Sequence, residues 1–170
     1  MGSLTTCPGW TKMKSNIPTI VIDTREQTPW EFDHPKIYRA LPAGDYSVDG
    51  MESLVAIERK RHAELVSCMT AGRDRFEREL ERSNGMHRLH LVAECSVKAL
   101  LFGLYDDWPS DTHVNAIRGT IISWDRRFPN LRLHFCGDRE SAQEWAWYLL
   151  QKSWKDYQSG KIGGKNVERN

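Results

Sequence analysis

The chain has 170 residues, a hydrophobic content of 39%, a charged content of 28% and a formal net charge of +1. This length suits one domain with an ordinary core, and the composition excludes an intrinsically disordered chain. The near-zero net charge excludes a grossly basic nucleic-acid binder, although basic patches beside an acidic site would cancel in the count.

The sequence offers neither a membrane span nor a secretory leader. No run approaches the roughly 20 apolar residues of a membrane helix, and the N-terminus lacks the apolar region of a signal peptide. We therefore expect an intracellular protein, located in the cytoplasm or nucleoid if bacterial or phage-derived and in the nucleus if eukaryotic. The four cysteines form no C-x-x-C pair and are expected to be reduced thiols, mostly buried.

The first predicted strand follows a polar lead-in. Residues 1–16 show no pattern and are expected to be flexible. The continuous apolar run at 19–24 predicts a buried central strand. Asp23 lies at its end, where sites form in open α/β sheets, although an aspartate there is also a common turn cap.

A proline-containing segment, residues 27–39, comes next and is expected to be a loop. Trp30 and Phe32 stand in it beside charged residues. Two interpretations are open for these rings: they pack the loop onto the domain, or they stack on an unpaired base.

The next two predicted strands carry the most informative residues. Residues 41–48 predict a turn into a strand and contain Asp45, and an apolar run then leads into Glu58, Arg59 and Lys60. Positions i and i+2 of a strand point to one side, so Glu58 and Lys60 share a face and Arg59 lies on the other. Adjacent pairing of the two strands would bring Asp45 beside Glu58.

Two adjacent carboxylates repel each other unless a cation lies between them. Hard divalent ions such as Mg²⁺ prefer these oxygen ligands, and a lysine beside them can hold a phosphate or orient a water that the metal makes more acidic. The set suits phosphodiester hydrolysis. The alternative is that Glu58 and Lys60 form an ordinary solvated pair on a strand.

The rest of the chain alternates helices and strands. An apolar stripe through Leu65, Met69, Phe76 and Leu80 predicts helix, and Gly72 is expected to divide it in two. The second piece, 73–82, is rich in Arg and Glu and predicts a salt-bridged solvent face with pairs at i,i+4. The later elements are a strand at 89–94, a helix at 96–104, a helix at 112–128, a strand at 131–136 and a helix at 138–157.

The last helix is apolar on two sides. One side, expected to pack on the sheet, carries Ala142, Trp145, Ala146 and Leu149; the other carries Trp147, Leu150, Trp154 and Tyr157. A helix that is apolar on both sides needs two partners, so we expect a homodimer through the 138–157 helix. The domain is then 17–158, followed by a Gly- and Lys-rich tail at 159–170 that we expect to be disordered. The element order predicts an α/β fold: a central mixed sheet with helices on both faces.

The motifs resemble those of a known family. Gly44-Asp45 followed by Glu58-Arg59-Lys60 resembles the G-D…E-R-K-x-x-x-D signature of the XPF-type structure-specific endonucleases, a branch of the PD-(D/E)xK superfamily. Further similarities are the D-x-R-E strand at Ile20 to Glu26, the G-R helix start at Gly72-Arg73, and the F-P-x-L-R entry at Phe128 to Leu133. One departure is Glu64, which stands where the family usually has Asp.

The resemblance implies a restriction-endonuclease-like core and a Mg²⁺-dependent endonuclease, with Mn²⁺ as a substitute, that cuts branched or flapped DNA in repair, recombination or replication. On this basis the metal ligands are Asp23, Asp45 and Glu58, the further catalytic residues are Lys60 and Glu64, and the DNA contacts are Arg25, Arg59 and Arg73. Arg25 has an alternative as an ion pair with Glu26.

The resemblance also bears on partners. Such domains commonly pair, in agreement with the expected homodimer. They are often followed by a helix-hairpin-helix module that this sequence lacks, so targeting is expected from the domain, from dimerisation or from a partner protein. Two other functions remain open: a non-catalytic DNA-binding scaffold subunit of a nuclease pair, and a junction-resolving or restriction-type nuclease.

Overall fold

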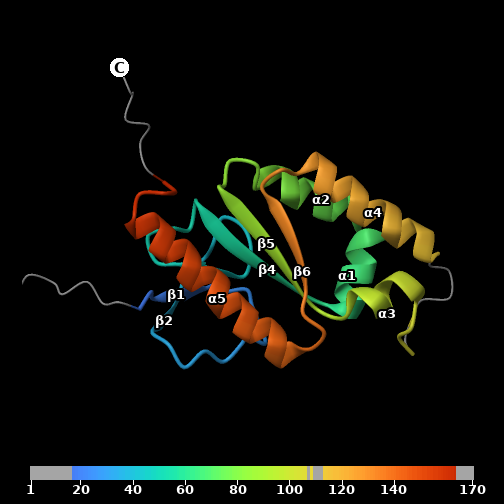
Figure 1. Cartoon of the computed structure of the whole chain (residues 1–170), viewed down its shortest axis with the longest axis horizontal. Helices are drawn as coiled ribbons and strands as arrows, with labels where there is room; N and C mark the ends of the chain where they lie inside the picture. The colour runs from blue at the N-terminus through green and yellow to red at the C-terminus, as the bar shows by residue number, and fades with distance from the viewer. Residues whose placement is uncertain (1–16, 107, 109–112, 164–170) are drawn as a thin grey trace, which may run out of the picture.

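A six-stranded sheet runs through the computed structural model, which describes residues 17–106, 108 and 113–163 (Figure 1). The strands are β1 (Ile20–Ile22), β2 (Lys36–Tyr38), β3 (Tyr46–Val48), β4 (Val55–Arg61), β5 (Arg88–Glu94) and β6 (Leu131–Phe135). Their spatial order is β2-β1-β3-β4-β5-β6. Because β3 is antiparallel to both β1 and β4 while the other pairs are parallel, the predicted mixed sheet is confirmed.

Helices cover both faces of this sheet, as the sequence predicts. They are α1 (His62–Met69), α2 (Arg73–Arg82), α3 (Val97–Phe102), α4 (Val114–Arg127) and α5 (Arg139–Gln158). In Figure 1, α5 lies across one face of the sheet, and the other helices lie on the opposite side. None of the helices in the described part of the chain is both long and apolar enough to cross a membrane.

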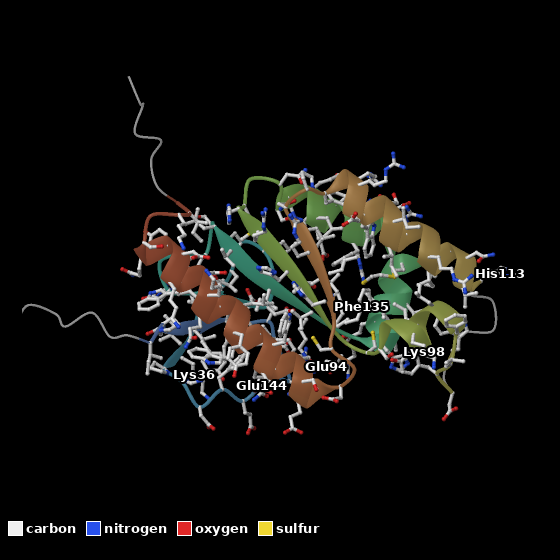
Figure 2. All side chains as sticks on the ribbon, viewed as in Figure 1. Lys36, Glu94, Lys98, His113, Phe135 and Glu144 are labelled. Carbon is white, nitrogen blue, oxygen red and sulfur yellow. The ribbon has the colours of Figure 1, made fainter. Side chains whose placement is uncertain are left out.

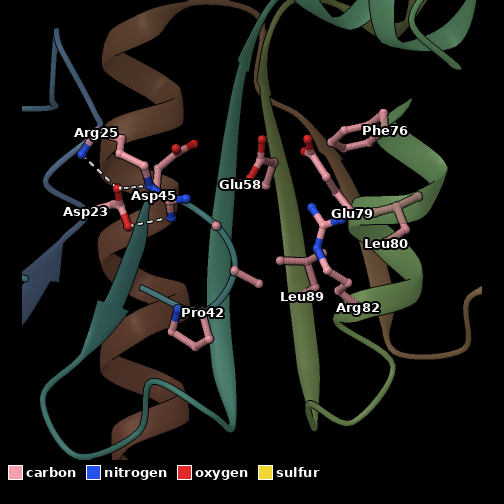
Figure 3. Close-up of a pocket in the computed structure, with 12 residues that line it drawn as sticks. Asp23, Arg25, Pro42, Asp45, Glu58, Phe76, Glu79, Leu80, Arg82 and Leu89 are labelled. Atoms are coloured by element: carbon pink, nitrogen blue, oxygen red, sulfur yellow. Dashed lines mark hydrogen bonds and ion pairs between the residues drawn. The ribbon is translucent and has the colours of Figure 1, made fainter. Parts of the chain in front are cut away.

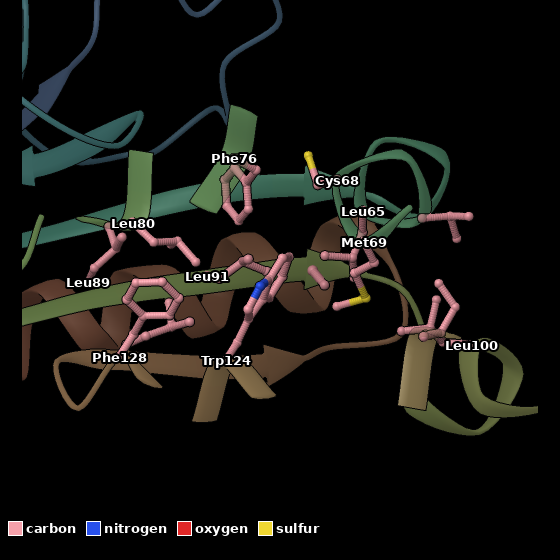
Figure 4. Close-up of a cluster of buried hydrophobic side chains, with 14 of the residues drawn as sticks. Leu65, Cys68, Met69, Phe76, Leu80, Leu89, Leu91, Leu100, Trp124 and Phe128 are labelled. Carbon is pink, nitrogen blue, oxygen red and sulfur yellow. The ribbon is translucent and has the colours of Figure 1, made fainter. Parts of the chain in front are cut away.

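Two apolar clusters, one on each face, follow from the alternation along β4 and β5. Ala56 on β4 and Leu91 on β5 face the cluster under α1, α2 and α4, which Figure 4 shows around Phe76 and Trp124. The intervening residues of the same strands, such as Ile57, face the cluster under α5. The alternation of side chains along a strand therefore assigns each residue of β4 and β5 to the helix layer on one face of the sheet or on the other.

Several local predictions are confirmed. Gly72 separates α1 from α2, and its backbone accepts a hydrogen bond from Phe76 N at 3.1 Å. Asp138 caps α5 by accepting from Ser141 N at 2.7 Å. The described cysteines, Cys68, Cys95 and Cys136, are free thiols.

The expected loop at 27–39 contains a short strand that the sequence did not predict. Strand β2 lies at the edge of the sheet, parallel to β1, and its three residues are exposed or half-buried. A strand of three residues that is not fully buried is too short to leave a hydrophobic pattern in the sequence. The two rings of this loop, Trp30 and Phe32, are buried, and Trp30 stacks on Tyr46 at 4.8 Å. They pack the loop onto the domain, so the base-stacking interpretation is wrong.

The packing of α5 differs from the prediction. The residues that are fully buried on the sheet are Ala142, Ala146 and Leu150. Trp147 and Trp154, expected to face another subunit, instead pack against the cluster under α5. Trp145, expected to face the sheet, is 47% exposed.

Two predicted terminal segments lie mostly outside the described residues. These are the lead-in at 1–16 and the tail beyond Gly163. The first part of the predicted tail, 159–163, forms turns instead of disordered chain, and its Ile162 packs against the cluster under α5.

Candidate active site

A cavity of about 220 Å³ lies between the ends of β1 and β3, the face of β4, and α2 (Figure 3). Its charged walls carry Asp23, Arg25, Asp45, Glu58, Glu79 and Arg82. The remainder is formed by Pro42, Ala43, Gly44, Phe76, Leu80 and Leu89. The sequence-predicted acidic residues Asp23, Asp45 and Glu58 therefore line one cavity.

Gly44 explains how Asp45 comes so close to β4. Its φ is +73°, and a Cβ placed there would lie 2.7 Å from the carbonyl oxygen of Ile57. Only glycine fits this left-handed conformation and this close approach. Asp45 N then donates to Ile57 O at 2.7 Å, and the Asp45 carboxylate accepts from Arg59 N at 2.8 Å. These bonds hold the carboxylate over the strand that carries Glu58.

Glu58 and Lys60 share one face of β4, as the alternation predicts. Lys60 Nζ donates to Glu58 Oε1 at 2.5 Å. The ammonium also lies 5.2 Å from the centre of the Phe76 ring, which packs on it from α2. Both side chains are more than four-fifths buried, so the pair, of which Glu58 lines the cavity, is not a solvated surface pair.

The electrostatics of the two carboxylates favour an added cation between them. Burial, and next the charge of Glu58, raise the pKa of Asp45. Burial also raises the pKa of Glu58, more than the neighbouring Lys60 lowers it. Burial would lower the pKa of Lys60, but the Glu58 carboxylate outweighs it and the net pKa is raised. Two carboxylates that resist ionisation together form a site where a further cation would be stabilised.

Asp23 lies beside Asp45 and holds Arg25. Asp23 N donates to Asp45 O at 2.8 Å, which fixes the two segments together. The Asp23 carboxylate accepts from Arg25 Nε and Nη2 at 2.7 and 2.8 Å and from Leu41 N at 2.6 Å. The hydrogen bonds from Arg25 hold the pKa of Asp23 at about 2. Arg25 therefore pairs with Asp23 and not with Glu26, the alternative that the sequence left open. Its side chain remains 72% exposed and lines the cavity.

Arg59 does not lie where a DNA contact requires it. Its side chain is 5% exposed, on the face of β4 opposite Glu58, and is paired with Glu94 at 2.7 Å. It also donates to the carbonyl of Thr28 at 2.6 Å. Figure 2 shows Glu94 near the end of β5, beside the N-terminal part of α5. The expected phosphate contact is corrected: this guanidinium joins β4, β5 and the loop after β1.

Arg73 and Glu64 also lie apart from the cavity lining. Arg73 pairs with Glu77 at 2.8 Å and reaches Ser123 of α4, so it faces α4 and not the carboxylates. Glu64 pairs with Arg61 and accepts from Arg61 N at 3.1 Å, forming a capping box at the start of α1. Glu64, which stands where the family signature usually has Asp, thus caps the start of α1.

Two cavity residues on α2 were missed by the sequence reasoning, Glu79 and Arg82. In Figure 3 the Glu79 carboxylate points toward Glu58, and the Arg82 guanidinium extends over β5. The signal available was the helical period, because Phe76 and Leu80 face the core and residues beside that stripe reach the cavity rim. The Arg- and Glu-rich pattern of this segment predicts a solvent-exposed face but does not indicate which neighbouring element that face borders.

The donor set fits a hard cation with few protein ligands. Within residues 17–106, 108 and 113–163, no group of three or more His, Cys, Asp or Glu side chains is arranged to hold a metal ion. Mg²⁺ commonly keeps several waters and takes only one or two carboxylates from the protein. The pair Asp45 and Glu58 meets that smaller requirement, whereas Asp23 is already occupied by Arg25 and Leu41 N.

Comparisons with known proteins agree with this fold. A family model described as the ERCC4 domain matches residues 22–149. Among solved structures, XPF from Aeropyrum pernix superposes with a TM-score of 0.61 at 14% sequence identity, covering 86% of this chain and 75% of that chain. At this identity the likeness supports the fold alone. A comparison with curated proteins gave no match.

Proposed function

The chain belongs to the ERCC4 domain family, and from this premise we propose that it is a Mg²⁺-dependent endonuclease that hydrolyses phosphodiester bonds in branched or flapped DNA. The observation that carries the proposal is that Asp45 and Glu58 line one cavity while Lys60 is hydrogen-bonded to Glu58, with the pKa of both carboxylates raised by burial.

Asp45, Glu58 and Lys60 have distinct tasks in this proposal. Asp45 and Glu58 would hold Mg²⁺, with Mn²⁺ as a substitute and with the carbonyl of Arg59 as a further donor. The ion, when bound, makes a water more acidic and stabilises charge developing on the phosphate. Lys60 exchanges its contact with Glu58 for the attacking water or a phosphate oxygen. The ring of Phe76, which packs on the ammonium, keeps it close to the Glu58 carboxylate.

Asp23 and Arg25 act as one unit. Because Asp23 is buried and accepts both Arg25 hydrogen bonds, it orients the guanidinium toward the cavity. Arg25 Nε and Nη2 donate to Asp23, and Nη2 also donates to Leu41 O, so Nη1 is the nitrogen left to donate to a phosphate. We therefore assign Asp23 a positioning task, in place of the metal ligation expected from the family resemblance, and assign Arg25 the scissile-strand phosphate.

The proposal includes partners. Homodimerisation would involve the outward side of α5, where Trp145 and Tyr148 are about half exposed. A hollow of about 350 Å³ beside them is lined by His134, Phe135 and Cys136 from the β6 segment. A partner protein that selects the DNA branch is compatible with this arrangement, as is selection by the domain itself.

One observation favours the second candidate, a non-catalytic scaffold subunit of a nuclease pair. The described residues contain no three-ligand metal cluster, and Glu64 is engaged by Arg61. Titration calorimetry with Mg²⁺ and Mn²⁺ separates the two candidates. Binding by the wild-type chain, reduced in Asp45→Asn, supports the enzyme; no binding of either ion supports the scaffold.

The test of the enzyme proposal is cleavage of end-labelled DNA. Fork, flap, Holliday-junction, single-stranded and duplex substrates are incubated with Mg²⁺, with Mn²⁺ and with chelator. The wild-type chain is expected to cut at the branch only with metal, and Asp45→Asn and Lys60→Ala are expected to lose cleavage. Asp125→Asn, the same change at an exposed site on α4, is the control. Undiminished cutting by Asp45→Asn contradicts the assignment, and a fixed cut sequence indicates a restriction-type enzyme.

A further inference from the structure

The wall of the cavity formed by α2 ends in an arginine to which the mechanism above assigns no task. Arg82 lies in the last turn of α2, is exposed, and lines the cavity with Glu79. Among the residues that the structure describes, its side chain forms no hydrogen bond or ion pair. A guanidinium with five donors therefore faces the cavity with its hydrogen bonding unused.

Four other arginines in this region are committed to protein partners. Arg59 is paired with Glu94, and both Arg73 and Arg127 are paired with Glu77. Arg25 is held by Asp23 on the opposite wall. Arg82 is thus the cavity cation, in the described part of the chain, that has no protein anion.

The charges of the cavity have a simple order. The carboxylates of Asp45, Glu58 and Glu79 lie in the middle, and one guanidinium lies on each side, Arg25 from the β1 segment and Arg82 from α2 (Figure 3). A nucleic-acid strand carries regularly spaced phosphates, and guanidinium groups bind phosphates in a bidentate manner. This order matches a nucleic-acid strand whose scissile phosphate lies over the carboxylates, near Arg25. The next phosphate along that strand would then lie near Arg82.

We propose that Arg82 binds the backbone phosphate adjacent to the scissile one, so that the substrate strand is held between Arg25 and Arg82. This inference rests on the proposed function, because it assumes a nucleic-acid substrate in the cavity. It assigns α2 to substrate positioning, through a residue outside the sequence signature that the chain shares with its family.

The alternative is that Arg82 only stabilises the C-terminal end of α2. A cation in the last turn of a helix interacts favourably with the helix dipole. Arg126 lies in the last turn of α4, one residue before the helix ends, and is likewise exposed. Arg126→Ala therefore removes the same charge from the same kind of helix end, at a place outside the cavity.

The experiment measures DNA affinity by fluorescence anisotropy, with a labelled fork and with chelator present, over a series of salt concentrations. Arg82→Ala is expected to bind about tenfold more weakly. Its slope of log affinity against log salt should be shallower by about one, because one phosphate contact is lost. Arg82→Lys keeps the charge and should retain the wild-type slope, and Arg126→Ala should match the wild type in both quantities.

Cleavage kinetics and thermal unfolding complete the test. For Arg82→Ala the KM should rise by a larger factor than kcat falls, with an unfolding temperature close to that of Arg126→Ala; if the alanine variant does not fold, Arg82→Gln replaces it. A wild-type salt slope in Arg82→Ala, or an equal loss in Arg126→Ala, overturns the inference while wild-type cleavage leaves the proposed function intact. A wild-type chain that neither binds nor cuts any DNA overturns both.

Discussion

Asp45 is the residue at which function and stability oppose each other. Its carboxylate is half-buried beside Glu58, so the ionised pair is costly in the absence of a cation. An asparagine would keep the shape and the hydrogen bond from Arg59 N, and would remove one of the two charges. Residues that serve a site at a cost to stability are common in enzymes.

We therefore predict that Asp45→Asn unfolds at an equal or higher temperature than the wild type in chelator. Added Mg²⁺ should raise the unfolding temperature of the wild type, because a ligand that binds only the native state stabilises it. The variant should not respond. Differential scanning fluorimetry with and without the ion measures both quantities, and Asp125→Asn should respond as the wild type does. A Mg²⁺ response of equal size in Asp45→Asn contradicts the metal assignment.

Gly44 permits a second prediction at this scale. Gly44→Ala combines a positive φ with a Cβ 2.7 Å from Ile57 O, whereas Gly50→Ala has a positive φ with nothing within 4 Å. The second change should cost only the backbone strain, about 1–2 kcal/mol. The first should cost at least about 1 kcal/mol more and displace Asp45. Urea unfolding of both variants isolates the close approach, and equal losses would show that β4 yields to the methyl group.

Strand alternation carried the successful part of the site prediction. It placed Glu58 and Lys60 on one side of β4, and the structure places them there. The same alternation placed Arg59 on the other side, yet the family resemblance assigned it to DNA. A motif records which residue types occur together but not which side chains are already neutralised, and Glu94, the partner of Arg59, is 35 residues away along the chain.

At the scale of elements, Glu77 connects α2 to α4. Its carboxylate accepts hydrogen bonds from Arg73 at 2.8 Å and from the buried Trp124 at 3.0 Å, and it pairs with Arg127. Burial would raise the pKa of Glu77, but these donors outweigh burial and hold the pKa at about 2. The ionised carboxylate therefore stabilises the packing of two helices on the same face of the sheet.

We predict that Glu77→Gln lowers the free energy of unfolding by about 1–2 kcal/mol at pH 7. Because the folded pKa lies below the ordinary value, this contribution is present above about pH 4.5 and is lost as the pH falls toward 2. The difference between variant and wild type should shrink over that interval, as measured by urea unfolding at a series of pH values. Glu81→Gln, an exposed change on the same helix, should differ from the wild type by less than about 0.5 kcal/mol.

The helical period predicts which residues share a side, but not which neighbour that side meets. Phe76 and Leu80 were correctly assigned to the core, and the break at Gly72 was correctly predicted. Arg73 was assigned to DNA on the family resemblance, and the sequence could not show that α4 packs beside α2 and engages it. For the same reason, Arg82 at the cavity became visible only with the tertiary arrangement.

At the scale of the whole molecule, element order and class were predictable because most elements have long, strongly patterned segments. The order of strands in the sheet was not predictable, and it decides which edges are open. Strand β2 forms one edge and β6 the other. Beside β6, Trp145 of α5 donates to His134 and is 47% exposed, and Tyr148, one turn further along α5, is 53% exposed. At the β2 edge Tyr38 is 58% exposed.

These two tyrosines allow a matched test of the proposed homodimer. If the outward side of α5 beside β6 is the interface, the wild-type chain sediments as a dimer at tens of micromolar, and Tyr148→Glu sediments as a monomer because it buries an unpaired charge. Tyr38→Glu, the same change at the opposite edge of the sheet, should remain a dimer. A wild-type monomer at these concentrations contradicts the homodimer, and dissociation by Tyr38→Glu alone moves the interface to the β2 edge. Since exposed aromatic residues contribute strongly to protein interfaces, the open β6 side is the edge that we expect to be covered.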